Sequence, residues 1–224
     1  PPIDVDIVVG GIPQRPKKPL NYNKVFNLEG LKHICYDLSP TMDDGLIVLL
    51  PPFSQHQKMI VPELARFSDE FRGKTETFVT AGASIAPYTY QKLGVRNLVE
   101  RTLRWPGFVK IMKNVREEDF DKIINQYIGP KTSAENPDLV FMKVSVSGGK
   151  PKDLKKKEIR LLELFDKETG LSAMEKTTGF PTALLAIKLA EGKLLPGVNP
   201  ADAAFPPKLI RQWYLPALRK YFNF

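Results

Sequence analysis

The feature that most constrains the fold is a pair of strand-like segments on either side of a lysine-rich loop. Apolar and polar residues alternate along 139–146, and a second strand-like segment, 158–165, follows a polar stretch with glycines, a proline and five lysines. Alternation with a period of two is typical of a strand that buries one face. The stretch between the two segments has the composition of a solvated turn, and no aromatic residue interrupts it as base stacking would require. We therefore predict a long antiparallel hairpin, which must belong to a sheet.

The rest of the chain predicts further strands and helices in no regular alternation. Strands are expected at 4–9, 46–50, 75–80 and 97–104, and helices at 27–36, 61–71, 108–115, 118–128, 177–191 and near the C-terminal end. Because no repeated strand–helix–strand unit appears, this mixture predicts an α+β domain. Its sheet should be mixed or largely antiparallel, with helices packed on one face.

Several local signals place the ends of these elements. Gly10 and Gly11 predict a turn after the first strand, and the apolar segment 46–50 predicts a buried strand. Asn27 is the expected N-cap of its helix. The segment 177–191 predicts a buried helix that Thr177 or Thr178 caps and a following glycine closes.

Composition narrows the choice of partner and compartment. The 33 Lys and Arg residues against 25 Asp and Glu residues give a net charge of +8, which is the only compositional hint of a polyanion, so nucleic acid is not the expected partner. The single cysteine excludes an intrachain disulfide and suits a reducing compartment, so we expect a cytoplasmic protein. No apolar run approaches the ~20 residues that cross a bilayer, so no membrane partner is expected. The chain opens without a methionine, and we interpret it as a fragment.

Residue chemistry alone gives no catalytic site. The sequence contains neither a G-x-G-x-x-G dinucleotide fingerprint nor a P-loop. His33 and His56 lack partners at metal-ligand spacing, so no metal is expected. Cys35 lies two residues from His33 on a predicted helix, and side chains so spaced do not face each other, which argues against a Cys–His nucleophile.

Three segments resemble one family of oxidoreductases. VGGIP at 9–13, followed by PLNYN at 19–23 and VFNLEGL at 25–31, resembles the opening of the second domain of saccharopine reductases and lysine 6-dehydrogenases. RTLRWPGF at 101–108 looks like the T-[LI]-R-[YW]-P-G-H signature of the saccharopine dehydrogenase-like family, with Phe108 in place of histidine. TGLSAMEKTTGF at 169–180 is similar to the family's T-G-x-x-A-M-x-x-T-T-G-[FY] segment. The likeness covers roughly residues 5 to 195.

The resemblance implies a domain arrangement and a function. It implies that residues 1–195 form a substrate-binding and dimerisation domain, that residues 196–224 form a helical extension, and that the N-terminal Rossmann domain is absent from this chain. The complete enzyme would use NAD or NADP to oxidise or reduce an amino acid or its imine adduct, of saccharopine or lysine type. This chain alone would then bind no cofactor and be inactive, and it would form a homodimer through the predicted hairpin.

The resemblance also selects residues for substrate binding, which are Gly11, Asn23, Arg104, Thr177, Thr178 and Gly179. Catalytic residues stay unassigned. For each selected residue a plain structural role is open as well. Gly11 either lets the backbone approach a ligand or makes a turn, and Asn23 either contacts substrate or belongs to an ordinary polar loop. Thr177, Thr178 and Gly179 either present a helix N-terminus to a carboxylate or merely cap it.

For Arg104 the alternatives are a carboxylate clamp and a structural ion pair with Glu100 or Glu29. For the whole chain, the alternative to a substrate domain is a non-catalytic oligomerisation or interaction module that keeps the same fold.

Overall fold

The computed structural model describes residues 3–83, 85–149, 153–195 and 197–224, and within them one mixed sheet organises the fold. The strands run in the order β10-β9-β1-β7-β3-β4, and β6 and β5 extend the sheet beside the second half of β7. The pair β1–β7 is parallel, whereas every other pairing in this sheet is antiparallel. Strand bounds are Ile3–Pro13 (β1), Ser39–Asp43 (β3), Leu46–Leu50 (β4), Gln57–Ile60 (β5), Lys74–Val79 (β6), Val95–Arg104 (β7), Asp138–Gly148 (β9) and Lys155–Leu164 (β10).

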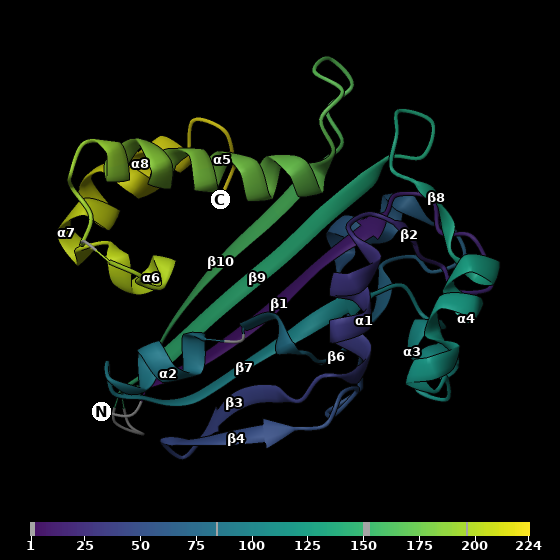
Figure 1. The fold of residues 1–224 in the computed structure, drawn as a ribbon, viewed down its shortest axis with the longest axis horizontal. Helices are drawn as coiled ribbons and strands as arrows, with labels where there is room; N and C mark the ends of the chain where they lie inside the picture. The colour runs from purple at the N-terminus through teal and green to yellow at the C-terminus, as the bar shows by residue number, and fades with distance from the viewer. Residues whose placement is uncertain (1–2, 84, 150–152, 196) are drawn as a thin grey trace.

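The predicted hairpin is confirmed. Strands β9 and β10 pair antiparallel from Leu139 opposite Leu164 to Gly148 opposite Lys155. Strand β9 also pairs along its whole length with β1, which makes these three long strands the backbone of the sheet (Figure 1). Residues 150–152 of the lysine-rich loop lie outside the described part of the chain.

Helices cover mainly one face of the sheet, as predicted for an α+β domain. In Figure 1, α5 (Ala173–Ala190) runs above β9 and β10, and α8 (Leu215–Leu218) lies beside it. At the other end of the sheet lie α1 (Leu28–Tyr36), α3 (Phe108–Met112) and α4 (Phe120–Tyr127). The other helical segments are Pro62–Phe67 (η1), Ala81–Ala83 (η2), Ala86–Gln91 (α2), Glu117–Asp119 (η3), Ala201–Ala204 (α6), Pro207–Leu209 (α7) and Ile210–Tyr214 (η4).

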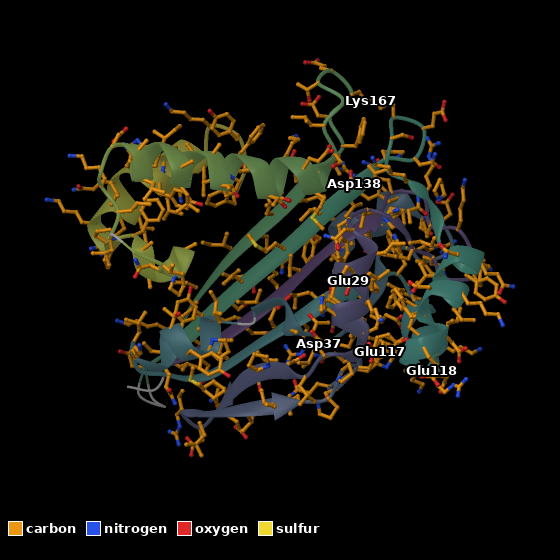
Figure 2. The ribbon with its side chains drawn as sticks, viewed as in Figure 1. Glu29, Asp37, Glu117, Glu118, Asp138 and Lys167 are labelled. Atoms are coloured by element: carbon orange, nitrogen blue, oxygen red, sulfur yellow. The ribbon has the colours of Figure 1, made fainter. Side chains whose placement is uncertain are left out.

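The main hydrophobic core fills the end of the domain where α1, α3 and α4 meet the sheet, the end at which Glu29, Glu117 and Glu118 are labelled in Figure 2. Its largest fully buried side chains include Trp105, Tyr22, Phe78, Phe108 and Phe120. The Trp105 indole N–H donates to the Pro13 carbonyl at 2.8 Å, so the polar group of this buried ring is satisfied. The core therefore fixes the chain immediately after β1 and β7, where the sequence signatures lie.

A two-stranded parallel ribbon stands beside this core. It pairs β2 (Asn23–Lys24) with β8 (Gly129–Lys131), and the Gly129 N–H donates to the Tyr22 carbonyl at 2.9 Å. Gly129 has no room for a side chain, because an added Cβ would clash with Asn23 Oδ1. The ribbon thus brings two loops together that are about a hundred residues apart in the sequence.

The turn predicted at Gly10 and Gly11 is wrong. Both glycines lie inside β1, which continues to Pro13, and neither has a positive φ. A Cβ at Gly10 would clash with the Leu103 carbonyl oxygen of β7, so this glycine permits a close approach of two strands. Pairing with β9 on the other side holds the strand extended through residues that would end an isolated strand.

Two predictions of burial are also wrong. Strand β4 is at the edge of the sheet, with Leu46 and Leu49 exposed, because an apolar composition says nothing about a strand's place in the sheet. Helix α5 is exposed along much of its length, including Ile187 and Leu189.

Of the helix expected at 61–71, only the 3₁₀ segment η1 forms.

Helix α5 starts earlier than predicted. Its N-cap is Ser172, whose hydroxyl accepts from the Glu175 N–H at 3.0 Å while the Glu175 carboxylate accepts from the Ser172 N–H at 2.8 Å. This reciprocal pair is a capping box. Thr177, Thr178 and Gly179 consequently lie inside the helix. The predicted N-cap Asn27 of α1 is confirmed, since its side chain accepts from the Gly30 N–H at 2.6 Å.

Candidate functional site

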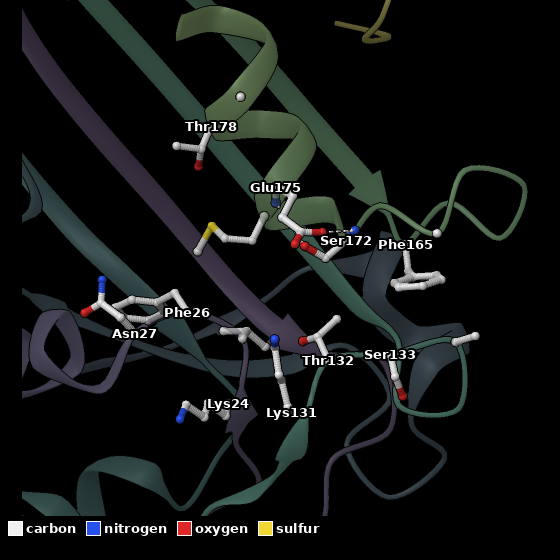
Figure 3. A pocket seen from close by; sticks show the side chains of 15 residues that line it. Lys24, Phe26, Asn27, Lys131, Thr132, Ser133, Phe165, Ser172, Glu175 and Thr178 are labelled. Atoms are coloured by element: carbon white, nitrogen blue, oxygen red, sulfur yellow. Dashed lines mark hydrogen bonds between the residues drawn. The ribbon is translucent and has the colours of Figure 1, made fainter.

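A pocket of about 870 Å³ lies where the first turns of α5 face the β2–β8 ribbon (Figure 3). Its volume is within the ~300–1,000 Å³ typical of small-molecule sites. Its lining comes from three parts of the chain: Lys24, Val25, Phe26 and Asn27 before α1; Lys131, Thr132, Ser133 and Ala134 after β8; and Phe165, Gly170, Ser172, Met174, Glu175, Thr178 and Gly179 around the start of α5.

The N-terminus of α5 is held in place by a buried carboxylate. Asp138, the first residue of β9, is fully buried, and its two carboxylate oxygens accept from the N–H groups of Ala173 at 2.9 Å and Met174 at 3.0 Å. Burial raises the pKa of the Asp138 carboxyl above its usual range, although the two N–H donors act in the opposite direction. Asp138 and Ser172 therefore use the backbone donors that a helix N-terminus would otherwise offer to a ligand.

Charged side chains of both signs surround the pocket. Lys24 and Lys131 are exposed, and neither forms a salt bridge with another described residue. In Figure 3, Lys131 points from β8 toward the first turn of α5, where Glu175 lies. Hydrogen bonds from the Ser172 backbone and side chain keep the pKa of Glu175 below its usual range, and the charge of Lys131 acts in the same direction. The pocket thus presents the side chains of two lysines and one glutamate.

Three of the selected residues lie on α5, at or next to this pocket. Thr178 and Gly179 line it, and Figure 3 shows the Thr178 side chain facing the space. The Thr177 hydroxyl donates to the Ala173 carbonyl at 2.9 Å within the helix. The prediction that these three residues form a helix N-terminus, for capping or for anion binding, is wrong because the capping box starts the helix five residues earlier.

Gly11 lies beneath Met174, a residue of the pocket wall. A Cβ added to Gly11 would lie 2.7 Å from Met174 Cε and 3.6 Å from Val25 Cγ2. Gly11 thus makes room for the Met174 side chain on the sheet, which supports the close-approach interpretation but places a methionine there.

Arg104 and Asn23 lie in the core behind the pocket. Arg104 is 2% exposed, and its Nη1 donates to Thr102 Oγ1 at 2.9 Å and to the Leu103 carbonyl at 2.8 Å. Its guanidinium lies 4.6 Å from the ring centroid of Tyr22, a cation–π contact. None of the salt bridges among described residues includes Arg104, and its Nε has no hydrogen-bond partner there. Asn23 is 2% exposed.

The histidines and the cysteine are separate from this pocket. The side chain of His33 is exposed, between Glu29 and Asp37, whereas His56 Nε2 lies 3.2 Å from Glu76 Oε2. Cys35 is 1% exposed, and burial raises the pKa of its thiol to about 12. No group of three or more metal-ligating side chains occurs within the ranges that the structure describes.

No helix in the described part of the chain has the length and apolar character needed to cross a membrane.

Several residues of the pocket escaped the sequence predictions. Lys24 and Lys131, which line the pocket, and Asp138, which anchors the start of α5, carried no signal of their own in the sequence, and only the pairing of β2 with β8 and the docking of α5 reveal their roles. Ser172 and Glu175 did carry a signal, because S-x-x-E before an apolar helix is the sequence form of a capping box.

Comparisons with a family model and with solved structures agree with each other. The family model described as the saccharopine dehydrogenase C-terminal domain matches residues 4–222. Among solved structures, the chain is similar to the apo, histidine-tagged saccharopine dehydrogenase (L-Glu forming) from Saccharomyces cerevisiae, with a TM-score of 0.62 and 13% sequence identity. That match covers 94% of this chain but 65% of the yeast chain, and at this identity it shows a shared fold.

Proposed function

Because the chain belongs to the saccharopine dehydrogenase C-terminal domain family, we propose that it is the substrate-binding and dimerisation domain of an NAD(P)-dependent oxidoreductase. The substrate would be an amino acid or its imine adduct, of saccharopine or lysine type. The observation that carries this proposal is the pocket at the start of α5, with Lys24, Lys131 and Glu175 around it.

The charges of this pocket complement those of an amino acid. A substrate carboxylate would accept charge-assisted hydrogen bonds from the ammonium groups of Lys24 and Lys131, which have no competing ion pair among the described residues. The substrate amine would lie toward Glu175, whose low pKa keeps it ionised. Thr178 adds a hydroxyl on the same wall.

Asn23 and Arg104 would act through the residues that touch the substrate. Asn23 is adjacent to Lys24 and pairs in register with Gly129 of β8. Arg104 packs on Tyr22, whose carbonyl accepts from Gly129. We assign both as positioning residues for the ribbon that carries the two lysines. The stronger claim, that Arg104 grips a substrate carboxylate, requires the guanidinium to become accessible.

The residues of this chain do not fit a nicotinamide dinucleotide. No two glycines in the sequence are separated by a single residue, so the G-x-G-x-x-G fingerprint is missing. The Gly10-Gly11 pair lies inside β1 and pairs with β9, and the Leu103 carbonyl and the Met174 side chain leave no room beside Gly10 and Gly11, respectively. We propose that a Rossmann domain elsewhere in the protein holds NAD or NADP, that residues 1–195 with the 196–224 extension serve the substrate, and that the protein is cytoplasmic.

We also propose that two copies associate through β10. This long strand is one of the edge strands of the sheet, and on its outer side it pairs with no other strand in the described part of the chain. An unpaired edge offers its backbone groups to another strand. Light scattering should give twice the chain mass of 25.3 kDa. A dimer that binds no amino acid would instead favour the non-catalytic oligomerisation module.

Calorimetric titration tests the pocket. L-saccharopine and L-glutamate are titrated into the 224-residue chain and into its Lys24→Gln and Lys131→Gln variants, with Lys122→Gln on α4 as the matched control. Each pocket variant should weaken binding by roughly tenfold, a discounted value for a charge-assisted hydrogen bond at an exposed site, whereas Lys122→Gln should not. Equal affinities in all four proteins, or no heat with either ligand at millimolar concentration, would refute the proposal.

A further inference from the structure

A second pocket, of about 480 Å³, lies between the sheet and the helices above it. Residues of β1, β9 and β10 form its floor, and residues of α5, α8 and the C-terminal segment form its roof. In Figure 1, α5 and α8 lie above these strands. The lining is Val9, Gly11, Val140, Met142, Val144, Ile159, Leu161, Met174, Thr177, Thr178, Pro181, Leu215, Leu218, Phe222 and Phe224.

The lining of this second pocket is almost entirely apolar. Among the described residues that line it, Thr177 and Thr178 are the only ones with polar side chains and none is charged, and the Thr177 hydroxyl already donates to the Ala173 carbonyl. Apolar side chains around an unfilled space lose dispersion contacts on one side. Water gains few hydrogen bonds in such a space, which therefore favours a hydrocarbon group. Two apolar walls face each other here, and what fits between them is an alkyl chain or a flat apolar group.

The polar and apolar pockets meet at Met174 and Thr178, which line both. The Met174 side chain rests on the sheet above Gly11. Methionine is unbranched and has flexible torsions, so its thioether moves aside at little cost. Met174, which lies between the two pockets, can thus move to let part of a ligand pass from one to the other. Gly11 leaves the sheet beneath Met174 free of a side chain.

We propose that the two pockets are compartments of one site whose ligand is an amino acid with an extended hydrocarbon portion. The inference rests on the proposed function for the charged head, which binds between Lys24, Lys131 and Glu175. The hydrocarbon portion passes Met174 and Thr178 and lies against Val140, Met142 and Val144 of β9, beneath α5 and α8.

A series of amino acids with unbranched side chains tests this inference. L-norvaline, L-norleucine, L-2-aminoheptanoic acid and L-2-aminooctanoic acid share one charged head and differ by one methylene each. Burial of each methylene should tighten binding by about fourfold, as expected for transfer out of water. If all four amino acids bind with the same dissociation constant, the proposal that the apolar pocket holds the hydrocarbon portion is wrong, whereas binding of the charged head in the polar pocket is still supported. If L-saccharopine binds and no member of the series does, this inference fails alone; if none of these ligands binds, the proposed function fails as well.

A variant that fills the apolar pocket with a larger side chain, compared with a matched variant outside it, tests where the hydrocarbon portion binds. Val144→Phe places a ring in the apolar pocket, whereas Val146→Phe makes the same change on the same face of β9 at a residue that does not line it. Val144→Phe should abolish the gain with chain length and leave norvaline affinity unchanged, and Val146→Phe should preserve both. A chain-length gain that survives Val144→Phe would contradict the assignment. Leu218→Trp, from the roof, gives the same test if Val144→Phe does not fold.

Discussion

Replacing Asp138 by asparagine tests how the start of α5, and with it the polar pocket, is held to the sheet. In the folded chain both oxygens of the Asp138 carboxylate accept from backbone donors, the N–H groups of Ala173 and Met174. Asparagine keeps the size and one acceptor oxygen, but its amide nitrogen is a donor. One backbone N–H of the first turn would therefore face another donor in a buried place.

The magnitude follows from two opposing effects. An unsatisfied buried N–H costs about 1–3 kcal/mol. Removing the charge recovers part of the desolvation penalty that raises the pKa of Asp138. The net loss should be about 1–2 kcal/mol, which for a chain of this length lowers the melting temperature by roughly 2–8 °C.

Urea unfolding measures the total change, and amide hydrogen exchange shows where it arises. Exchange should accelerate at Ala173 and Met174 and at the residues of the first turn of α5. Asp43→Asn is the control, because Asp43 is exposed on β3 and the change should stay within about 0.5 kcal/mol. An Asp138→Asn variant as stable as the parent, with unchanged exchange at both amides, would refute this account of how α5 is anchored.

Three further predictions concern single residues. Gly179→Ala should raise the free energy of unfolding by about 0.5–1 kcal/mol, since Gly179 lies inside α5 with open space around the added methyl group; a loss of stability would contradict the observed helix start. The Cys35 thiol should react with a thiol-specific reagent at pH 8 far more slowly in the native chain than in urea. Because burial raises the pKa of Cys35 to about 12, the folded state holds the thiol proton more tightly than the unfolded state, so stability should fall as pH rises from about 9 toward 12; rapid native labelling would contradict the burial. Arg104→Lys should lower the free energy of unfolding by about 1–3 kcal/mol, through loss of the two Nη1 hydrogen bonds and the stack on Tyr22. An unchanged melting temperature would remove the structural role and leave the substrate clamp, which kinetics of the complete enzyme would then test.

The parts of the fold that depend on local pattern could be predicted from the sequence. The β9–β10 hairpin follows from alternation on both sides of a turn, and the Asn27 cap follows from side-chain chemistry within one turn. The α+β class follows from the mixture of elements. The start of α5 was also readable, at Ser172 and Glu175, but two threonines further along offered a competing cap.

The parts that depend on tertiary neighbours could not be predicted. Gly10 and Gly11 stay extended because each of them pairs with a residue of β9, and β4 is exposed because it is an edge strand of the sheet. The candidate site was the hardest part to predict, because its residues come from segments that lie far apart in the sequence. Lys24 and Lys131 meet through strands of two and three residues, which are too short to leave a periodic signal.

The location of amino-acid binding is the most direct test of the account. Amide chemical shifts of the isotope-labelled 224-residue chain are recorded during titration with L-saccharopine. The largest changes should occur at Thr132 and Ser133 after β8 and at Thr178 and Gly179 on α5, with saturation at a single dissociation constant. Saturable changes confined to other parts of the domain, with these four amides unmoved, would contradict it.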